Sequence, residues 1–347
     1  MRKRIEWIDI CKGFGMFFIY LGHFGNDAGL AYPWVFSFHV PLFFFISGLL
    51  ENYNHLGFFQ NFRKKFITIL LPFFFFGILM TGIRAVNGNT TDYILSDISI
   101  LLKGGIRNTC VMAQGLWFLT CLFTIEILFS VLKKLKWKPI IFLGCAGLFF
   151  IAEFLITPKP TELPHWYGNL DSAFYYMIYY CIGWLLFAPL EKILSSQNRR
   201  VVWGRRLAFL FCVFYSAELF FGKNIFAVWL QKGIMLREIF ILIGPMFTIY
   251  MVVVISHYFS YSKYLQEFGR NSLYLCGNET FSRILVQMIL SAVGINIVIS
   301  QPLQAYLYAL LLMLVVNKIL IPLERPVLSG FQNFVEERSC FKKNEKK

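Results

Sequence analysis

Apolar segments, each long enough to span a bilayer, recur from one end of this 347-residue chain to the other. A helix needs about 20 mostly apolar residues to cross the hydrocarbon core. Ten candidate spans can be traced, at residues 8–26, 34–51, 66–85, 115–132, 139–156, 172–190, 206–222, 234–256, 270–292 and 303–321. Because backbone polar groups must be satisfied inside lipid, the sequence predicts an all-α polytopic bundle of about ten transmembrane helices.

The proportions of apolar and charged residues support the same conclusion. Hydrophobic residues make up 57% of the chain and charged residues 15%, whereas an ordinary globular chain carries about 25% charged residues. A soluble domain of this size could not hide so much apolar surface, because its exterior must stay largely polar. The composition therefore excludes a soluble enzyme, a disordered tail and a secreted disulfide scaffold.

Basic residues gather in short blocks between the apolar segments. The blocks at 2–4, 63–65, 133–138 and 199–206 fall in alternate gaps, the pattern of cytoplasmic loops in a polytopic membrane protein. This pattern predicts cytoplasmic N- and C-termini, and it accounts for the net charge of +14 without a nucleic-acid partner. We expect a single transmembrane domain at 1–325, in contact with membrane lipids, and a basic cytoplasmic tail at 326–347.

Polar residues line one side of the first predicted span. Asp9, Lys12, Tyr20, His23 and Asp27 recur there at helical spacing. Lys12 and His23 differ by about 20° around a helix and by about 16 Å along its axis. Because polar groups are costly in lipid, we expect this stripe to face the bundle interior or a water-filled cavity.

The two ends of the stripe suit different chemistry. The ammonium group of Lys12 is a point charge suited to phosphate, and an imidazole such as that of His23 exchanges protons near neutral pH. Asp9 is expected to pair with Lys12, three residues on. Two structural alternatives stay open: His23 as a hydrogen-bonded packing residue, and Lys12 extending to the membrane interface.

A second histidine inside a predicted span, His39, lies near the outer end of 34–51, two residues before Pro41. It either binds substrate or satisfies the turn that Pro41 kinks, and the sequence favours neither interpretation. Two histidines without a carboxylate or thiol at ligand spacing do not make a metal site, so we expect no metal.

Glutamates also lie inside the predicted spans. Glu279 is in the ninth span, with Arg283 four residues later, which is the spacing of a helical ion pair. A structural pair is favoured over a role for Glu279 in orienting His23 or the substrate. The sequence assigns no role to Glu126 or Glu218.

The longest outer segment, roughly 86–114, has its own pattern. Its centre, 92–102, is expected to form a short amphipathic helix on the outer face of the membrane. A loop of this length either shapes a binding site or only connects two spans.

Several segments resemble the bacterial integral-membrane acyltransferase-3 family, particularly its fucose-4-O-acetylase-like branch. They are IDICKGFGMFFIYLGH with Lys12 and His23, FHVPLFFFISG, FRKKFITILLPFFFF, GLWFLTCLF, GRNSLYL and LERP. Two departures stand out. Where the family often has a histidine after GRNSLYL, this chain reads CGNETFSRI with Asn278 and Glu279, and we expect no extracytoplasmic hydrolase-like domain.

The resemblance implies transfer of an acyl group, usually acetyl from acetyl-CoA, to a sugar hydroxyl of an envelope glycan at the bacterial cytoplasmic membrane. On this interpretation His23 is a general base or acyl relay, assisted by Asp9 and Glu279. The acyl-CoA phosphates would meet Lys12 and the basic residues Arg63, Lys64 and Lys65, and the glycan or lipid-linked sugar acceptor would meet Tyr20, Asp27 and His39.

Two other classes compete with an acyltransferase. A transporter or flippase for a small solute or lipid-linked glycan would show the same buried charges and basic inner face. Such proteins often carry matched, broken half-helices, and only the unmatched Pro41 and Pro245 are found here. A non-catalytic assembly subunit would not need the polar stripe.

Overall fold

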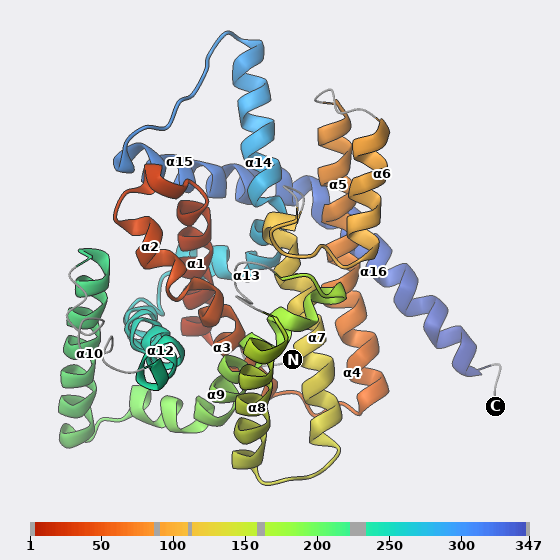
Figure 1. Ribbon diagram of the computed structural model, residues 1–347. Coiled ribbons are helices and arrows are strands. Elements are labelled where there is room, and N and C mark those ends of the chain that lie inside the picture. The colour runs from red at the N-terminus through yellow and green to blue at the C-terminus, as the bar shows by residue number, and fades with distance from the viewer. Residues whose placement is uncertain (1–3, 87–90, 110–112, 158–163, 223–233, 345–347) are drawn as a thin grey trace. The chain divides into compact units, whose positions relative to one another are not determined.

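The computed structural model describes residues 4–86, 91–109, 113–157, 164–222 and 234–344 (Figure 1). Within these residues every regular element is a helix, and there is no β-strand. The predicted all-α class is therefore confirmed. Each of the ten predicted spans coincides with a helix or with two consecutive helices.

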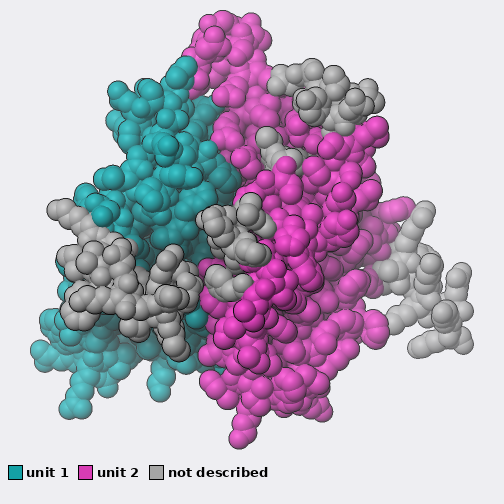
Figure 2. Space-filling view, in the orientation of Figure 1, with its two compact units in different colours: residues 1–52, 182–272, 298–313 teal, residues 53–181, 273–297, 314–347 magenta. Residues whose placement is uncertain are grey.

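The chain divides into two compact units, each assembled from three stretches (Figure 2). Unit 1 comprises residues 1–52, 182–272 and 298–313, and unit 2 comprises 53–181, 273–297 and 314–347. The units interleave along the sequence. The predicted boundary at 325 falls inside a helix of unit 2, so the division into a 1–325 domain and a tail stays a prediction.

Unit 1 is built around α1. Its elements are α1 (Glu6–Gly22), η1 (Gly25–Ala28), α2 (Ala31–Phe36), α3 (His39–Glu51), the later half of α9 (Leu170–Ser195), α10 (Arg199–Phe220), α12 (Ile234–Tyr258), α13 (Lys263–Arg270) and α15 (Pro302–Val315). Helices α2, α3, α12 and α13 all contact α1. Ile10 and Cys11 have no exposed surface, as expected for a helix that is covered on several sides.

The predicted span at 34–51 is two helices rather than one. Phe38 has φ −145° and ψ −18°, outside the helical region, and α3 begins at His39. The cause is Pro41, which has no N–H to donate to the carbonyl of Ser37 and is tolerated only in the first turn of a helix. The break places His39 at the start of α3.

Unit 2 contains the remaining elements. They are α4 (Phe58–Lys65), the π-helical turn η2 (Phe66–Leu70), α5 (Leu71–Val86), α6 (Thr91–Leu102), α7 (Ala113–Lys133), α8 (Pro139–Ile156), η3 (Tyr167–Asn169), the first half of α9, α14 (Ser272–Ala292), the π-helical turn η4 (Val316–Leu320) and α16 (Ile321–Asn344).

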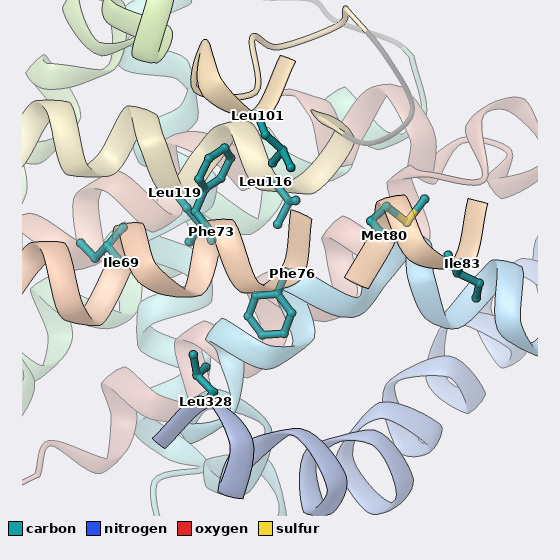
Figure 3. Close-up of a cluster of buried hydrophobic side chains, with 9 residues drawn as sticks. All are labelled: Ile69, Phe73, Phe76, Met80, Ile83, Leu101, Leu116, Leu119 and Leu328. Carbon is teal, nitrogen blue, oxygen red and sulfur yellow. The ribbon is translucent and has the colours of Figure 1, made fainter. Parts of the chain in front are cut away.

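A buried apolar cluster surrounds α5 in unit 2 (Figure 3). Phe73 lies with Leu101, Leu116 and Leu119 on one side of α5, whereas Phe76 lies on the side that faces Leu328. Opposite faces of α5 therefore pack against α6 and α7 and against α16. This arrangement explains why the segment is apolar all round.

Helix α6 differs from the expectation in its position. A helix forms at 91–102, but it runs back along α5: Arg84 pairs with Asp97 at 2.8 Å, and the Cδ2 atom of Leu101 lies against Gly77. It is therefore packed against a neighbouring helix instead of lying alone on the outer face. The salt bridge and the apolar contact account for this packing.

Five helical stretches among the described residues are long and apolar enough to cross a membrane. They are Ala31–Glu51, Phe58–Val86, Gln114–Lys133, Tyr167–Ser195 and Pro302–Glu337, with Pro139–Glu153 and Leu242–Tyr258 as shorter apolar helices. Such a set is typical of a multi-pass membrane protein. The predicted count of ten and the orientation of the termini stay predictions.

Candidate active site

The polar stripe lies on α1, at the centre of unit 1. The helix is continuous from Glu6 to Gly22, and His23 caps its C-terminus with the helical dihedrals φ −74° and ψ −2°. The angular spacing of Lys12 and His23 therefore holds through the end of the helix, with a rise of about 16 Å between them. Both side chains are half-buried, and Tyr20 is 1% exposed.

Asp27 does not belong to this stripe, contrary to the expectation from helical spacing. Beyond His23 the backbone reaches Gly25 at φ +59°, and Asp27 lies in the separate 3₁₀ turn η1, where it is exposed. A glycine adopts positive φ without the steric cost that other residues incur. The helix therefore ends four residues earlier than the span predicted at 8–26.

The N-terminal half of the stripe packs against α13. The Nε atom of Arg270 lies 3.5 Å from an Asp9 carboxylate oxygen. One residue earlier, a Cβ atom on Gly269 would stand 1.6 Å from the Asp9 carbonyl oxygen. Only glycine allows the two backbones to come so close, so two segments far apart in sequence meet here through a residue with no side chain. The predicted Asp9–Lys12 pair stays a prediction.

Arg270 is the residue of this site that the sequence reasoning missed. In the sequence it is the second residue of GRNSLYL, and no local pattern there points to α1. The signal that could have found it is the Gly-Arg pair itself, because a glycine beside a charge often marks a close backbone approach. A buried carboxylate also needs a cationic partner.

His39 is held by the break between α2 and α3. Its Nδ1 atom lies 2.8 Å from the carbonyl oxygen of Val35, and its ring meets Phe36 edge-on at 4.8 Å between centroids. Because a carbonyl can only accept, Nδ1 must carry the proton, and a neutral His39 would accept a proton through Nε2.

The same turn of α2 contacts the C-terminal end of α1. A Cβ atom on Gly22 would lie 3.0 Å from Phe36 and 3.1 Å from Val35. Val35 and Phe36 thus touch both the residue before His23 and the ring of His39. One helical turn therefore joins the segments that carry the two histidines.

The predicted basic residues lie in unit 2, on α4. Lys64 is exposed, whereas Arg63 donates to the carbonyl oxygen of Glu336 at 2.6 Å. Lys65 forms an ion pair with Glu126 at 2.5 Å, with 17% and 6% of the two side chains exposed. Glu126, to which the sequence assigned no role, is thus the counter-ion of Lys65, and Lys64 is the more accessible cation.

Glu279 lies on α14 in unit 2 and is 2% exposed. One of its carboxylate oxygens accepts from the hydroxyl of Thr280 at 2.7 Å. The neighbouring Asn278 donates to a carboxylate oxygen of Glu324, in the LERP segment of α16, at 2.7 Å. The sequence did not predict this buried contact, because the LERP segment by itself does not indicate which residue Glu324 meets. The expected Glu279–Arg283 pair stays a prediction.

No group of three or more His, Cys, Asp and Glu side chains within the described part of the chain is placed to hold a metal ion. The groups that the predicted site residues supply on α1 and at the start of α3 are the ammonium group of Lys12, the ion-paired carboxylate of Asp9 and the imidazoles of His23 and His39. Such groups can bind anions and move protons.

The family comparison covers nearly all of these residues. The family model for the acyltransferase-3 domain, described as an acyltransferase domain, matches residues 5–320. No curated protein and no solved structure matches the chain. The match includes the whole of α1, both histidines, the basic end of α4 and the polar residues of α14.

Proposed function

Because the chain belongs to the acyltransferase-3 family, and is thus a multi-pass membrane acyltransferase, we propose a specific reaction for it. An acyl group, in the first instance acetyl, is moved from cytosolic acyl-CoA to a hydroxyl of an envelope or extracellular glycan. The family match over residues 5–320 carries this proposal and favours it over transport.

The proposed setting is the bacterial cytoplasmic membrane, with ten spans and both termini in the cytoplasm. The alternating basic blocks support this orientation. Further support comes from the fact that a helix occupies each predicted span. The resemblance of the motifs favours the fucose-4-O-acetylase-like branch.

The proposed catalytic group is His23. Its imidazole takes the proton of the acceptor hydroxyl as the oxygen attacks the thioester carbonyl. The C–S bond then breaks, and the imidazolium returns the proton to the departing thiolate, so that an ester and free CoA are formed. In the covalent alternative, His23 first receives the acyl group and then passes it to the hydroxyl.

The remaining residues are proposed to bind the substrates and to position the base. Lys12 with Arg63 and Lys64 would bind the acyl-CoA phosphates, with a smaller part for Lys65 because Glu126 neutralises it. Tyr20, Asp27 and His39 are proposed to bind the acceptor sugar.

Two further residues are proposed to position the others. Asp9 would hold the inner end of α1 through Arg270, and Glu279 would orient polar groups on α14.

The test uses purified protein in sealed proteoliposomes with acetyl-CoA labelled in the acetyl group. Release of CoA thiol and incorporation of label into an envelope glycan preparation are followed together, with His23→Ala as the paired sample. The proposal expects both signals from the natural protein and neither from the variant. Movement of glycan across the membrane without release of CoA would favour the transporter and contradict the proposal.

A further inference from the structure

The turn between α6 and α7, residues 103–109, lies deep in unit 2. Because α6 runs back along α5, the turn is level with the middle of the Phe58–Val86 stretch: a Cβ atom on Gly105 would lie 3.0 Å from the ring of Phe73. Non-helical backbone at such a depth is tolerated only where it is buried in protein or lines a water-filled cavity.

Asn169 holds this turn in place. It is fully buried, and its amide nitrogen donates to the carbonyl oxygens of Gly104 and Gly105 and to the hydroxyl of Thr120, at 3.1, 3.2 and 2.9 Å. Its side-chain oxygen accepts from the backbone N–H of Arg107 at 2.9 Å. One side chain thus binds three polar groups of the turn and the Thr120 hydroxyl of α7, and it fixes the position from which Arg107 projects.

The guanidinium of Arg107 lies among aromatic rings. Its Cζ atom is 4.5 Å from the centroid of the Trp117 ring and 6.0 Å from that of Tyr176, and Nη1 donates to the Tyr176 hydroxyl at 3.1 Å. Arginine has five N–H donors, and this hydrogen bond commits one of them. The two rings and the Tyr176 hydroxyl restrict the guanidinium, and its other N–H groups could donate to a ligand.

No carboxylate neutralises this charge within the described part of the chain. Arg107 forms no ion pair there. Asp171, two residues after Asn169, accepts hydrogen bonds from the backbone N–H groups of His165, Trp166 and Ser172 at 2.7–3.0 Å. A half-buried cation without a counter-ion is unfavourable unless an anion binds to it.

We propose that Arg107 is an anion-binding residue that receives a phosphate or carboxylate group of a substrate, with Trp117 and Tyr176 holding the guanidinium in place. A planar, pre-oriented guanidinium binds such groups through two parallel hydrogen bonds. The proposed function enters this inference only in naming the two substrates that could carry the anionic group. They are the acyl-CoA donor and an acidic or phosphorylated sugar acceptor.

The test measures binding rather than transfer. Natural protein and Arg107→Gln in nanodiscs are titrated calorimetrically with CoA, inorganic pyrophosphate, glucose 1-phosphate and glucuronate, and with glucose as the neutral reference. The matched control is Lys103→Gln, which removes a charge from an exposed position in the same turn. We expect Arg107→Gln to lower the affinity for one class of anionic probe by about 10- to 100-fold. Lys103→Gln should change that affinity by less than twofold.

The identity of the weakened probes distinguishes the carriers. Loss of CoA and pyrophosphate binding assigns the site to the donor, and loss of sugar phosphate or sugar acid binding assigns it to the acceptor. Should the glutamine variant not fold, Arg107→Lys retains a charge but not the planar fork, and about tenfold weaker binding is expected from it. Equal affinities in natural and variant protein, or an equal loss in Lys103→Gln, would overturn the inference. Anion binding without acyl transfer would overturn only the proposed function.

Discussion

The Arg270 guanidinium lies 3.5 Å from the Asp9 carboxylate, although the two residues are far apart in the sequence. Asp9 is 8% exposed, and an isolated buried carboxylate is costly. The contact therefore anchors the N-terminal end of α1, the helix that also carries Lys12 and His23, to α13 within unit 1.

This pairing predicts an energetic coupling between the two residues. Asp9→Asn and Arg270→Gln should each lower the thermal unfolding midpoint. The double variant should lose less unfolding free energy than the two single variants lose together, and the difference, the coupling energy, should be about 0.5–3 kcal/mol. Unfolding of the purified protein in detergent measures the cycle. A parallel cycle with Lys12→Gln tests the expected Asp9–Lys12 pair. Strict additivity of Asp9 and Arg270 would contradict the anchoring role.

The backbone contact at Gly269 predicts a second, separate effect. Gly269→Ala should destabilise the protein by about 1–3 kcal/mol, because overpacking forces the backbone to shift. Gly82→Ala is the matched control, since Gly82 is also helical and a Cβ atom there would meet nothing within 4 Å. Equal stability of the two alanine variants in thermal melts would show that α1 and α13 do not pack this closely.

For the proposed base, we expect His23→Ala to reduce acyl transfer by about 10²–10⁴-fold without lowering the unfolding midpoint. His55→Ala, at an exposed histidine outside the site, should leave transfer unchanged. Label incorporation into glycan gives the rate, and size-exclusion chromatography reports folding. Full activity in a well-folded His23→Ala variant would remove His23 from the mechanism.

The two neighbouring lysines of α4 should behave differently. Lys65→Gln leaves the carboxylate of Glu126 buried without its counter-ion, so we expect it to lower the unfolding midpoint. Lys64→Gln removes an exposed charge and should spare stability while raising the KM for acyl-CoA. The reverse pattern, a stable Lys65→Gln with a raised KM, would indicate that Lys65 and not Lys64 binds the donor.

The hydrogen bond between Asn278 of α14 and Glu324 of α16 predicts that a negative charge at residue 278 lowers the stability of the protein. Asn278→Asp would set a second carboxylate beside Glu324, and we expect a clear loss of stability from like-charge repulsion. Gln197→Glu adds the same charge at an exposed position between α9 and α10, outside the predicted spans, and should be tolerated. If both variants melt at the same temperature, the Asn278–Glu324 hydrogen bond does not hold these helices together.

The positions of the helices could be predicted from the sequence because hydropathy and periodicity are local properties. The same local rules place Lys12 and His23 on one face of α1. They failed at Asp27, because a single glycine at positive φ ends the helix and a count of residues cannot foresee it. They indicated a kink at Pro41, but they treated 34–51 as one span, whereas the structure has two helices with the break before His39.

Sequence alone therefore determined the helical class, the membrane setting and the face of α1 that carries the ammonium and imidazole groups. Only the tertiary structure decided the partners: Arg270 for Asp9, Glu126 for Lys65, Glu324 for Asn278 and the aromatic rings around Arg107. The physical reason is that these contacts join residues far apart in the chain. Which of them form depends on how the helices pack, and a local pattern carries no record of that packing.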